Sequence, residues 1–294
     1  MTVLEGMLIE GPQGWGEFSP PPGCDDRQAG RWLTAAIEVG TVGWPDPLRG
    51  WVPVAVTVPA VSPQRARQLV IDAGCRTAAV RVAEGGLSDD LARLEAVRDA
   101  LGSGGAIRCD VDGRWDVDTA VTAIPVLDRA AGGLEFIGQP CGSLADLAAV
   151  RRRVGVPIAV YLREAPVGDL AGSADVAVLN VGALGGVRRA LRAAESCAVP
   201  CTVTADAASS IGTSGGLALA GVLDDLGYAG MLGGVRLLAG DLVSSGRSLI
   251  ARDGSLPVAP MPPAPQPALL ERFAAGPDRV AWWRERLRAA QSHL

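Results

Sequence analysis

Lysine is absent from this chain of 294 residues, so all 27 of its basic residues are arginine. A lysine amine can lose its proton and act as a base, whereas an arginine stays protonated. The sequence therefore excludes any mechanism that uses a lysine base. A GC-rich coding bias is one explanation for a lack of surface lysines.

Histidine and metal-binding cysteine patterns are almost absent too. The single histidine, His293, is the penultimate residue, and the six cysteines form no C-x-x-C pair. Only Cys197 and Cys201 lie close together in the sequence. This pattern argues against a Cys/His zinc site and favours free, mostly buried thiols in a reducing cytoplasm.

Aromatic residues make up only 4% of the chain, and the formal net charge is −5 without any basic block. Nucleic-acid binding favours a basic face and stacking aromatics, so we expect no nucleic-acid partner. No apolar run reaches the roughly 18 residues of a membrane span, and no signal pattern begins the chain. With 48% hydrophobic and 20% charged residues, the composition is that of a globular rather than a disordered protein. We expect its partner to be a small-molecule substrate, and the formation of a homo-oligomer stays open.

Short apolar runs alternate with longer amphipathic stretches from about residue 51 onward. The expected strands are residues 54–59, 78–83, 106–111, 134–137, 157–161, 176–181, 201–205 and 228–232. The expected helices are residues 62–73, 89–101, 116–131, 143–154, 186–198 and 214–224, with caps at Ser62, Ser88, Asp116 and Ser143. Because parallel strands need crossover helices, this order predicts an α/β fold, a (β/α)₈ barrel.

The two ends of the chain differ from this alternation. Residues 7–10 and 15–18 predict a β-hairpin that is followed by a helix at about residues 27–39. We therefore expect a small, shortened α+β cap over residues 1–50 and the barrel over residues 51–255. Residues 256–294 form a Pro-rich tail and a final helix over residues 277–290, which is expected to pack back on the cap or barrel.

Four long motifs occur in order along the chain: E-G-P-Q-G-W-G-E-F-S-P (10–20), V-P-V-A-V-T-V-P-A (52–60), D-V-D-G-R-W-D-V-D-T-A (110–120) and L-N-V-G-A-L-G-G-V-R-R-A-L (179–191). On these motifs the chain resembles the o-succinylbenzoate synthases of the enolase superfamily, especially those of actinobacteria, from about residue 3 to about residue 250. The resemblance implies a cap-plus-barrel fold with the active site at the carboxyl ends of the strands.

The resemblance also implies Mg²⁺ held by three carboxylates, which would stabilise an enediolate. Asp110 matches the first carboxylate. Gly138 stands where an E-Q-P triplet would place the second, and Tyr161 stands where a turn after the fifth strand would place the third. A hard divalent cation needs several oxygen ligands, so these residues predict a site without a metal.

The family's catalytic lysines are matched by other residues as well. The K-x-K at the end of the second strand is matched by Ala79 and Arg81, and the sixth-strand lysine by Asn180. The seventh-strand motif is replaced by residues 206–209, which begin with Asp206 and end with Ser209. The ordinary activity of the family is therefore expected to be lost.

Neighbouring strand ends of a barrel point into one cavity, so the replacing residues are candidates for a rebuilt site. The expected catalytic residues are Arg81, Asp110, Tyr161 and Asp206; the expected substrate-binding residues are Arg163, Asn180, Gly138 and Ser209. No metal and no cofactor is expected. Structural alternatives stay open, because Asp110 could pair with Arg81 or Arg163, Tyr161 could fill the volume of the lost metal, and Asn180 could be a structural hydrogen-bonder.

Three functions remain at this point. The first is a metal- and cofactor-independent cyclase, isomerase or lyase that acts on a carbonyl-bearing substrate, such as a secondary metabolite. The second is a barrel that binds a ligand or partner without turnover. The third is residual o-succinylbenzoate synthase activity, a dehydration, at an unusual site.

Overall fold

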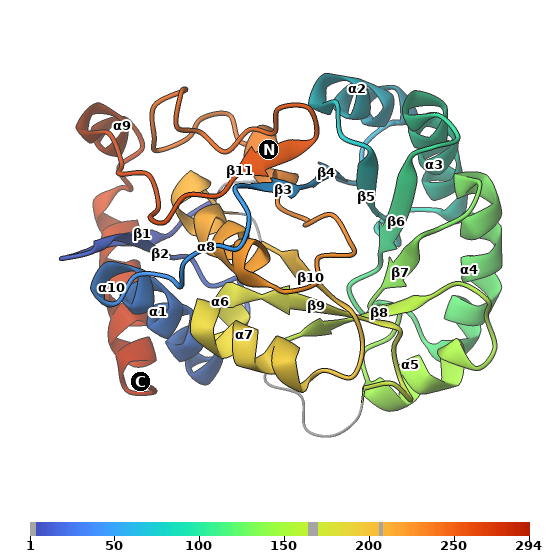
Figure 1. Ribbon diagram of the computed structural model, residues 1–294, viewed down its shortest axis with the longest axis horizontal. Coiled ribbons are helices and arrows are strands. Elements are labelled where there is room, and N and C mark those ends of the chain that lie inside the picture. Colours follow the sequence, from blue (N-terminus) through green and yellow to red (C-terminus); the bar gives the residue numbers. More distant parts are fainter. Residues whose placement is uncertain (1–3, 164–169, 206–207) are drawn as a thin grey trace.

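The N-terminal cap is a hairpin that lies on one helix (Figure 1). The computed structural model describes residues 4–163, 170–205 and 208–294. Strands β1 (Met7–Gly11) and β2 (Gly14–Phe18) pair antiparallel, as predicted, and helix α1 (Asp26–Thr41) follows with a complete capping box between Asp25 and Gln28. The hairpin approaches α1 so closely that a Cβ atom on Gly16 would overlap the Ala36 carbonyl.

A parallel sheet of seven strands forms the barrel wall within the described residues, in the order β10-β9-β8-β7-β6-β5-β4. The strands are β4 (Ala55–Val58), β5 (Thr77–Arg81), β6 (Ala106–Asp110), β7 (Phe136–Gly138), β8 (Ile158–Leu162), β9 (Val176–Asn180) and β10 (Cys201–Thr204). The order follows the chain without a reversal, which is the topology of a barrel and not of an open doubly wound sheet.

The prediction of an eighth strand over residues 228–232 is wrong, because these residues, all of which the structure describes, form no regular strand. Only two isolated parallel bridges form there, between Val54 and Gly230 and between Thr204 and Met231. These bridges still join both edges of the sheet and close the ring. Glycine is unfavourable in strands, and at Gly233 the chain turns so close to β4 that a Cβ atom would lie 2.5 Å from the Ala55 carbonyl oxygen.

Helices cover the outside of the ring (Figure 1). They are α2 (Pro63–Ala73), α3 (Leu87–Leu101), α4 (Val117–Ala131), α5 (Leu144–Arg151), α6 (Val181–Leu184), α7 (Val187–Ser196) and α8 (Ser210–Val222), followed by the 3₁₀ turn η1 (Gly233–Leu237). The predicted caps Ser62, Asp116 and Ser143 are confirmed, since each side chain accepts a backbone N–H of the first turn. The predicted cap Ser88 is wrong, because α3 begins at Leu87 after Gly86.

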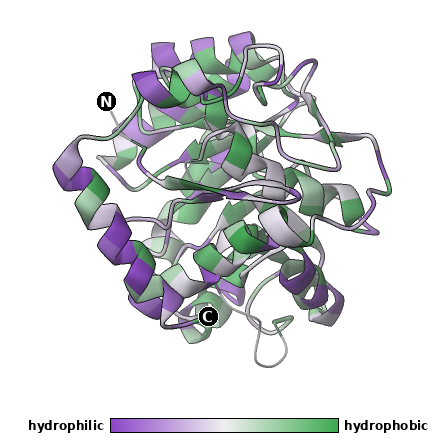
Figure 2. Ribbon diagram, turned by 90° about the vertical axis from the view of Figure 1, so that its left-hand side faces the viewer, coloured by the Kyte–Doolittle hydropathy of each residue, from purple (hydrophilic) through white to green (hydrophobic). Residues whose placement is uncertain are grey.

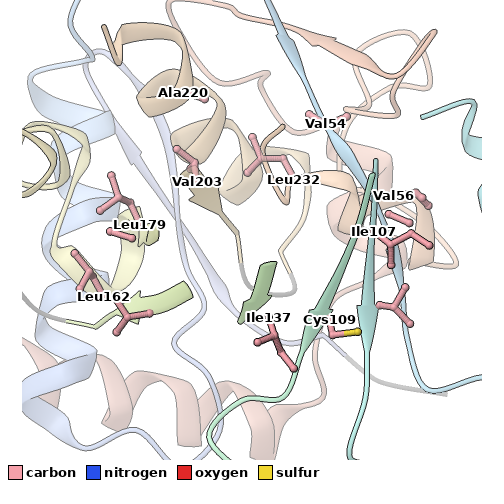
Figure 3. Packing of buried hydrophobic residues seen from close by; sticks show 14 of the residues in the cluster. Val54, Val56, Ile107, Cys109, Ile137, Leu162, Leu179, Val203, Ala220 and Leu232 are labelled. Atoms are coloured by element: carbon pink, nitrogen blue, oxygen red, sulfur yellow. The ribbon is translucent and has the colours of Figure 1, made fainter. Parts of the chain in front are cut away.

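Side chains alternate between the two faces of the barrel wall. Aliphatic residues such as Val56, Ile107, Ile137 and Leu179 face the helices and form the large core, as Figure 3 shows. The opposite face of the same strands carries small or aromatic residues, among them Phe136, which form a second cluster inside the ring. This two-residue period places every second residue near a strand's carboxyl end in the barrel mouth.

The chain returns to the cap after the barrel. Strand β11 (Ser255–Pro257) pairs with β3 (Trp51–Pro53), and α9 (Pro267–Arg272) precedes α10 (Pro277–Gln291). Helix α10 packs on the cap, where Trp283 meets Phe18 edge to face with ring centroids 5.9 Å apart. Figure 2 shows this end of the molecule, with hydrophilic and hydrophobic segments along the helix that leads to the C-terminus. No helix of the described residues is long and apolar enough to cross a membrane.

Candidate functional site

The carboxyl ends of β5, β6 and β7 bring the first three predicted site residues together. Arg81 is the register partner of Asp110, and Asp110 is the register partner of Gly138. All three lie on the inward face of the wall, two residues above Ala79, Arg108 and Phe136 respectively. The structure therefore places Arg81, Asp110 and Gly138 side by side at the carboxyl ends of their strands, and their role as site residues stays a prediction.

Arg81 forms ion pairs with several carboxylates at the mouth. Its Nη1 lies 2.9 Å from Asp110 Oδ2 and 3.6 Å from Asp112 Oδ2, and its Nε lies 3.4 Å from Glu84 Oε1. The Arg81 side chain is 31% exposed and that of Asp110 is 23% exposed. The structural alternative that paired Asp110 with Arg81 is thus confirmed, whereas Arg163 pairs with Asp112 instead, at 3.1 Å.

Tyr161 reaches this cluster from β8 by passing over Gly138. A Cβ atom added to Gly138 would lie 2.6 Å from the Tyr161 hydroxyl oxygen and 3.0 Å from the ring carbon that bears it. The hydroxyl also lies near enough to the Asp110 carboxylate to lower the pKa of that group, against the effect of burial. Tyr161 therefore occupies the space that a side chain at position 138 would need, and it brings a phenol to Asp110.

Gln139 holds the strand that carries Tyr161. Its side-chain Oε1 accepts the Tyr161 backbone N–H at 2.8 Å, and its Nε2 donates to the Cys141 carbonyl at 2.8 Å. Gln139 has φ of +42°, an uncommon backbone conformation for a residue other than glycine. The strain is offset by these two hydrogen bonds, which fix the height of Tyr161 in the barrel.

Burial dominates the acid–base behaviour of the cluster. It raises the pKa of Asp110, although the Arg81 charge and the Tyr161 hydroxyl oppose the rise. Burial and the nearby Asp110 charge raise the pKa of Tyr161 well above its usual range, so the phenol keeps its proton at neutral pH. Asp110 Oδ1 is buried and has no hydrogen-bond partner among the described residues. The site thus offers a hydroxyl donor beside a carboxyl group with an unpaired oxygen.

The Mg²⁺ that the family resemblance implies does not fit these residues. The charge of Asp110 is already opposed by Arg81, Gly138 has no side chain, and the Tyr161 hydroxyl fills the space beside it. Within residues 4–163, 170–205 and 208–294, no group of three or more His, Cys, Asp or Glu side chains could hold a metal ion. A divalent cation placed here would meet the Arg81 guanidinium instead of a set of oxygen ligands.

The remaining predicted site residues have other partners or lie outside the description. The Asn180 side chain accepts the Ala183 N–H and caps α6, which agrees with a structural hydrogen-bonder. Ser209 caps α8, and its hydroxyl donates to Glu17 of the cap. Arg163 is 68% exposed, and its carbonyl accepts a hydrogen bond from Arg31 of α1. Asp206 lies outside the described residues.

A hollow lies between the cap and the β9–β10 side of the barrel. It has a volume of about 50 Å³. Its polar lining comes from Glu17, Asn180 and Thr204, and the indole of Trp32 closes it by resting on Gly182. A space of this size holds only a few water molecules, so it does not admit a substrate in this form of the molecule.

Sequence reasoning missed three residues of these sites. Asp112 and Glu84 join the ion pairs at the mouth, and their positions next to predicted strand ends were a usable signal. Glu17 belongs to a hairpin far from the barrel in sequence, and no local pattern links it to Ser209. Its contact depends on how the cap sits on the barrel.

Comparisons with known proteins agree with the fold and with the sequence motifs. Residues 1–40 match the family described as enolase N-terminal domain-like, and residues 62–262 match the one described as enolase C-terminal domain-like. The o-succinylbenzoate synthase of Thermobifida fusca is 47% identical over 99% of this chain and 92% of its own length. That of Mycolicibacterium smegmatis is 40% identical over 99% of this chain and 91% of its own length.

Solved structures support the same architecture. Muconate cycloisomerase from Pseudomonas fluorescens superposes with a TM-score of 0.75 at 20% identity, covering 92% of this chain and 97% of its own. The L-Ala-D/L-Glu epimerase from Bacillus subtilis superposes with a TM-score of 0.70 at 19% identity, covering 86% of each chain. At these identities the likeness concerns the fold alone.

Proposed function

We propose that this chain, which belongs to the o-succinylbenzoate synthase family of the enolase superfamily, works without a metal. It keeps the family's barrel and acts as an isomerase or cyclase. Its substrate is a small molecule that carries a carbonyl and a carboxylate. The observation that carries the proposal is the position of Tyr161. Its hydroxyl fills the space beside Gly138 and faces Asp110, so hydrogen-bond donors stand where the resemblance expects a cation.

Each residue of the cluster has a role in this proposal. Arg81 binds the substrate carboxylate, which competes with Asp110 for the guanidinium. Asp110 then loses its closest positive charge, and its pKa, already raised by burial, rises further toward neutral pH. In its carboxylate form Asp110 takes a proton from the carbon next to the carbonyl, and Tyr161 donates a hydrogen bond to the oxygen on which negative charge develops.

Returning the proton to another carbon completes an isomerisation. Addition of the enolate carbon or oxygen to a C=C or C=O double bond of the same substrate completes a cyclisation: the π bond breaks, and the protonated Asp110 returns its proton to the atom at the far end of that bond.

The residual family reaction is the less favoured possibility. The resemblance assigns proton transfer to lysines, and this chain has none. The expected metal ligands are reduced to Asp110, which pairs with Arg81. Binding without turnover is a stronger alternative, because the ion pairs of Arg81 with Asp110 and of Arg163 with Asp112 neutralise the cluster.

The experiment uses 4-oxo-4-phenylbutyrate, an aromatic keto acid with one carbonyl and one carboxylate. The protein is incubated with it in D₂O and EDTA, and proton NMR follows deuterium uptake next to the ketone. We expect faster exchange than in buffer, reduced about 10²–10³-fold by Tyr161→Phe. Tyr228→Phe is the matched control, since Tyr228 stacks on Phe136 lower in the barrel and should leave the rate unchanged.

The other outcomes distinguish the alternatives. Exchange that EDTA abolishes and Mg²⁺ restores would support the residual family reaction. Saturable binding of the keto acid without exchange, weakened by Arg81→Met, would support a binding barrel. If wild type, Tyr161→Phe and Arg81→Met all behave like buffer in both measurements, the Arg81–Asp110–Tyr161 cluster is not the working site.

A further inference from the structure

Two glutamates of the cap insert into the amino ends of two barrel helices. Glu17, on β2, reaches the first turn of α8, and Glu38, on α1, reaches the first turn of α7. Both helices are long enough to have a marked positive end, since α7 has 10 residues and α8 has 13. These contacts have no part in the proposed chemistry, and only the route by which a ligand reaches the mouth rests on the proposed function.

The carboxylate of Glu17 is surrounded by donors. It accepts the Gly212 N–H at 3.2 Å, the Ser209 N–H at 3.3 Å and the Ser209 hydroxyl, and Ser19 of the cap donates to it at 2.8 Å. A Cβ atom on Gly212 would lie 2.9 Å from the Glu17 carboxyl group. The barrel side of the contact therefore depends on a glycine in the first turn of α8.

The carboxylate of Glu38 repeats this arrangement on the next helix. It accepts the Val187 N–H at 2.5 Å and the Arg188 N–H at 3.2 Å, and Arg188 Nη1 lies 3.3 Å away. A Cβ atom on Gly186 would overlap this carboxylate, and Gly186 also has φ of +121°, which favours glycine. Both contacts thus pair a cap carboxylate with a glycine at the start of a barrel helix.

Between these contacts, Trp32 of α1 rests on Gly182 and closes the hollow beside Asn180. On the β5–β7 side of the mouth, the Arg81, Asp110 and Asp112 side chains are 23–34% exposed. We infer that Glu17 and Glu38 are two positioning residues that hold the cap closed over the β9–β10 side of the barrel, so that a ligand reaches the mouth from the β5–β7 side. Breaking both contacts would free the cap from that side.

Peptide-resolved hydrogen exchange tests this inference on the full chain. In the double variant Glu17→Gln, Glu38→Gln, amides of β2, α1 and the first turns of α7 and α8 should exchange about 10–100-fold faster, while amides of β5 and β6 keep their rates. Glu10→Gln is the matched control, since Glu10 lies exposed in the same hairpin. A uniform acceleration over the whole chain, or wild-type rates in the cap, would overturn the inference.

Gly212→Ala tests the Glu17 contact by changing its barrel side, and both glutamates stay in place. Alanine favours a helix, so α8 itself should be no weaker. Its Cβ atom would nevertheless meet the Glu17 carboxyl group and Ala208 at 2.9 Å, so cap amides should exchange faster. Unchanged cap exchange in Gly212→Ala would contradict the Glu17 contact even if the double variant failed to fold.

Discussion

The floor and the mouth of the barrel each contain one arginine on an inward position of neighbouring strands, and the two are held in different ways. At the floor, Arg108 is 1% exposed, pairs with Glu135 at 2.5 Å, donates to the Ala229 carbonyl at 2.6 Å and lies 4.7 Å from the centre of the Phe136 ring. At the mouth, the Arg81 side chain is 31% exposed and forms ion pairs with the carboxylates of Glu84, Asp110 and Asp112.

This difference separates a structural ion pair from an exchangeable one. Burial lowers the pKa of Arg108, and the Glu135 charge opposes the change, so the guanidinium and its partner depend on each other. Arg81 is accessible to solvent, so the carboxylate of a ligand could replace a carboxylate of the protein as its ion-pair partner. We therefore expect substitutions at the floor to reduce stability most, and substitutions at the mouth to alter chemistry while leaving the fold intact.

The largest effect is expected for Arg108→Met. Removing one partner of a buried ion pair typically costs about 3–5 kcal/mol, and the loss of cross-barrel contacts with Phe136 and Ala229 adds to it. Urea unfolding followed by circular dichroism would measure the change. A loss below about 1 kcal/mol would show that Arg108 is as exchangeable as Arg81, and the contrast between floor and mouth would fail.

Gly138→Ala should have the next largest effect on stability. The new methyl group would lie 2.6 Å from the Tyr161 hydroxyl, and overpacking of this kind costs about 1–3 kcal/mol. The cost should fall when Tyr161→Phe is combined with it, because the closest atom is then missing. Equal costs in the two backgrounds, measured by a double-mutant cycle, would mean that Tyr161 does not occupy this space.

Tyr161→Phe alone should cost about 1 kcal/mol, the usual contribution of one hydrogen bond. The ring still fills the barrel above Gly138, so the packing is kept. Differential scanning calorimetry would detect the small shift, and the exchange assay with the keto acid would detect the much larger loss of rate. A stability loss above about 3 kcal/mol with an unchanged exchange rate would make the phenol a structural group only.

Arg81→Met should have the smallest effect near neutral pH, below about 1 kcal/mol, because partly exposed ion pairs contribute little. Its pH dependence is more telling. Because the pKa of Asp110 is raised in the folded state, Asp110 contributes stability at low pH, and this contribution is lost as pH rises through the folded pKa. Removing the Arg81 charge raises the folded pKa of Asp110 further, so more stability is lost at high pH.

The cost of Arg81→Met should therefore be close to zero at about pH 4 and grow toward pH 8. Asp110→Asn supplies the control, because in that background only the longer ion pairs of Arg81 with Asp112 and Glu84 remain, so the cost should change much less over this range. A cost that is equal at pH 4 and pH 8, measured by urea unfolding at each pH, would mean that Arg81 and Asp110 are not coupled.

Local features of the fold could be predicted from the sequence because they depend on neighbours in the chain. Ser62, Asp116 and Ser143 cap their helices as expected, since a cap needs only its own first turn. The prediction that Ser88 caps α3 was wrong, because Gly86 is the cap and the helix begins at Leu87. The prediction of an eighth strand was wrong because two isolated bridges, at Gly230 and Met231, are enough to close the ring. Strand propensity does not distinguish such bridges from a regular strand.

The candidate site could be predicted in its residues but not in its contacts. Parallel strands place Arg81, Asp110 and Gly138 side by side whatever the side chains do, so the sequence was sufficient there. The path of Tyr161 over Gly138 depends on a side-chain conformation that no spacing encodes. Arg108 was missed although strict alternation along β6 puts it on the same face as Asp110.

The central claim is that residues of the chain itself fill the place where the family resemblance expects a metal. An electron paramagnetic resonance titration with Mn²⁺ tests it most directly, since free and bound Mn²⁺ give different signals. We expect wild-type protein and Asp110→Asn to bind equally little Mn²⁺ at millimolar concentration. Binding of about one Mn²⁺ per chain by wild type, lost in Asp110→Asn, would contradict it.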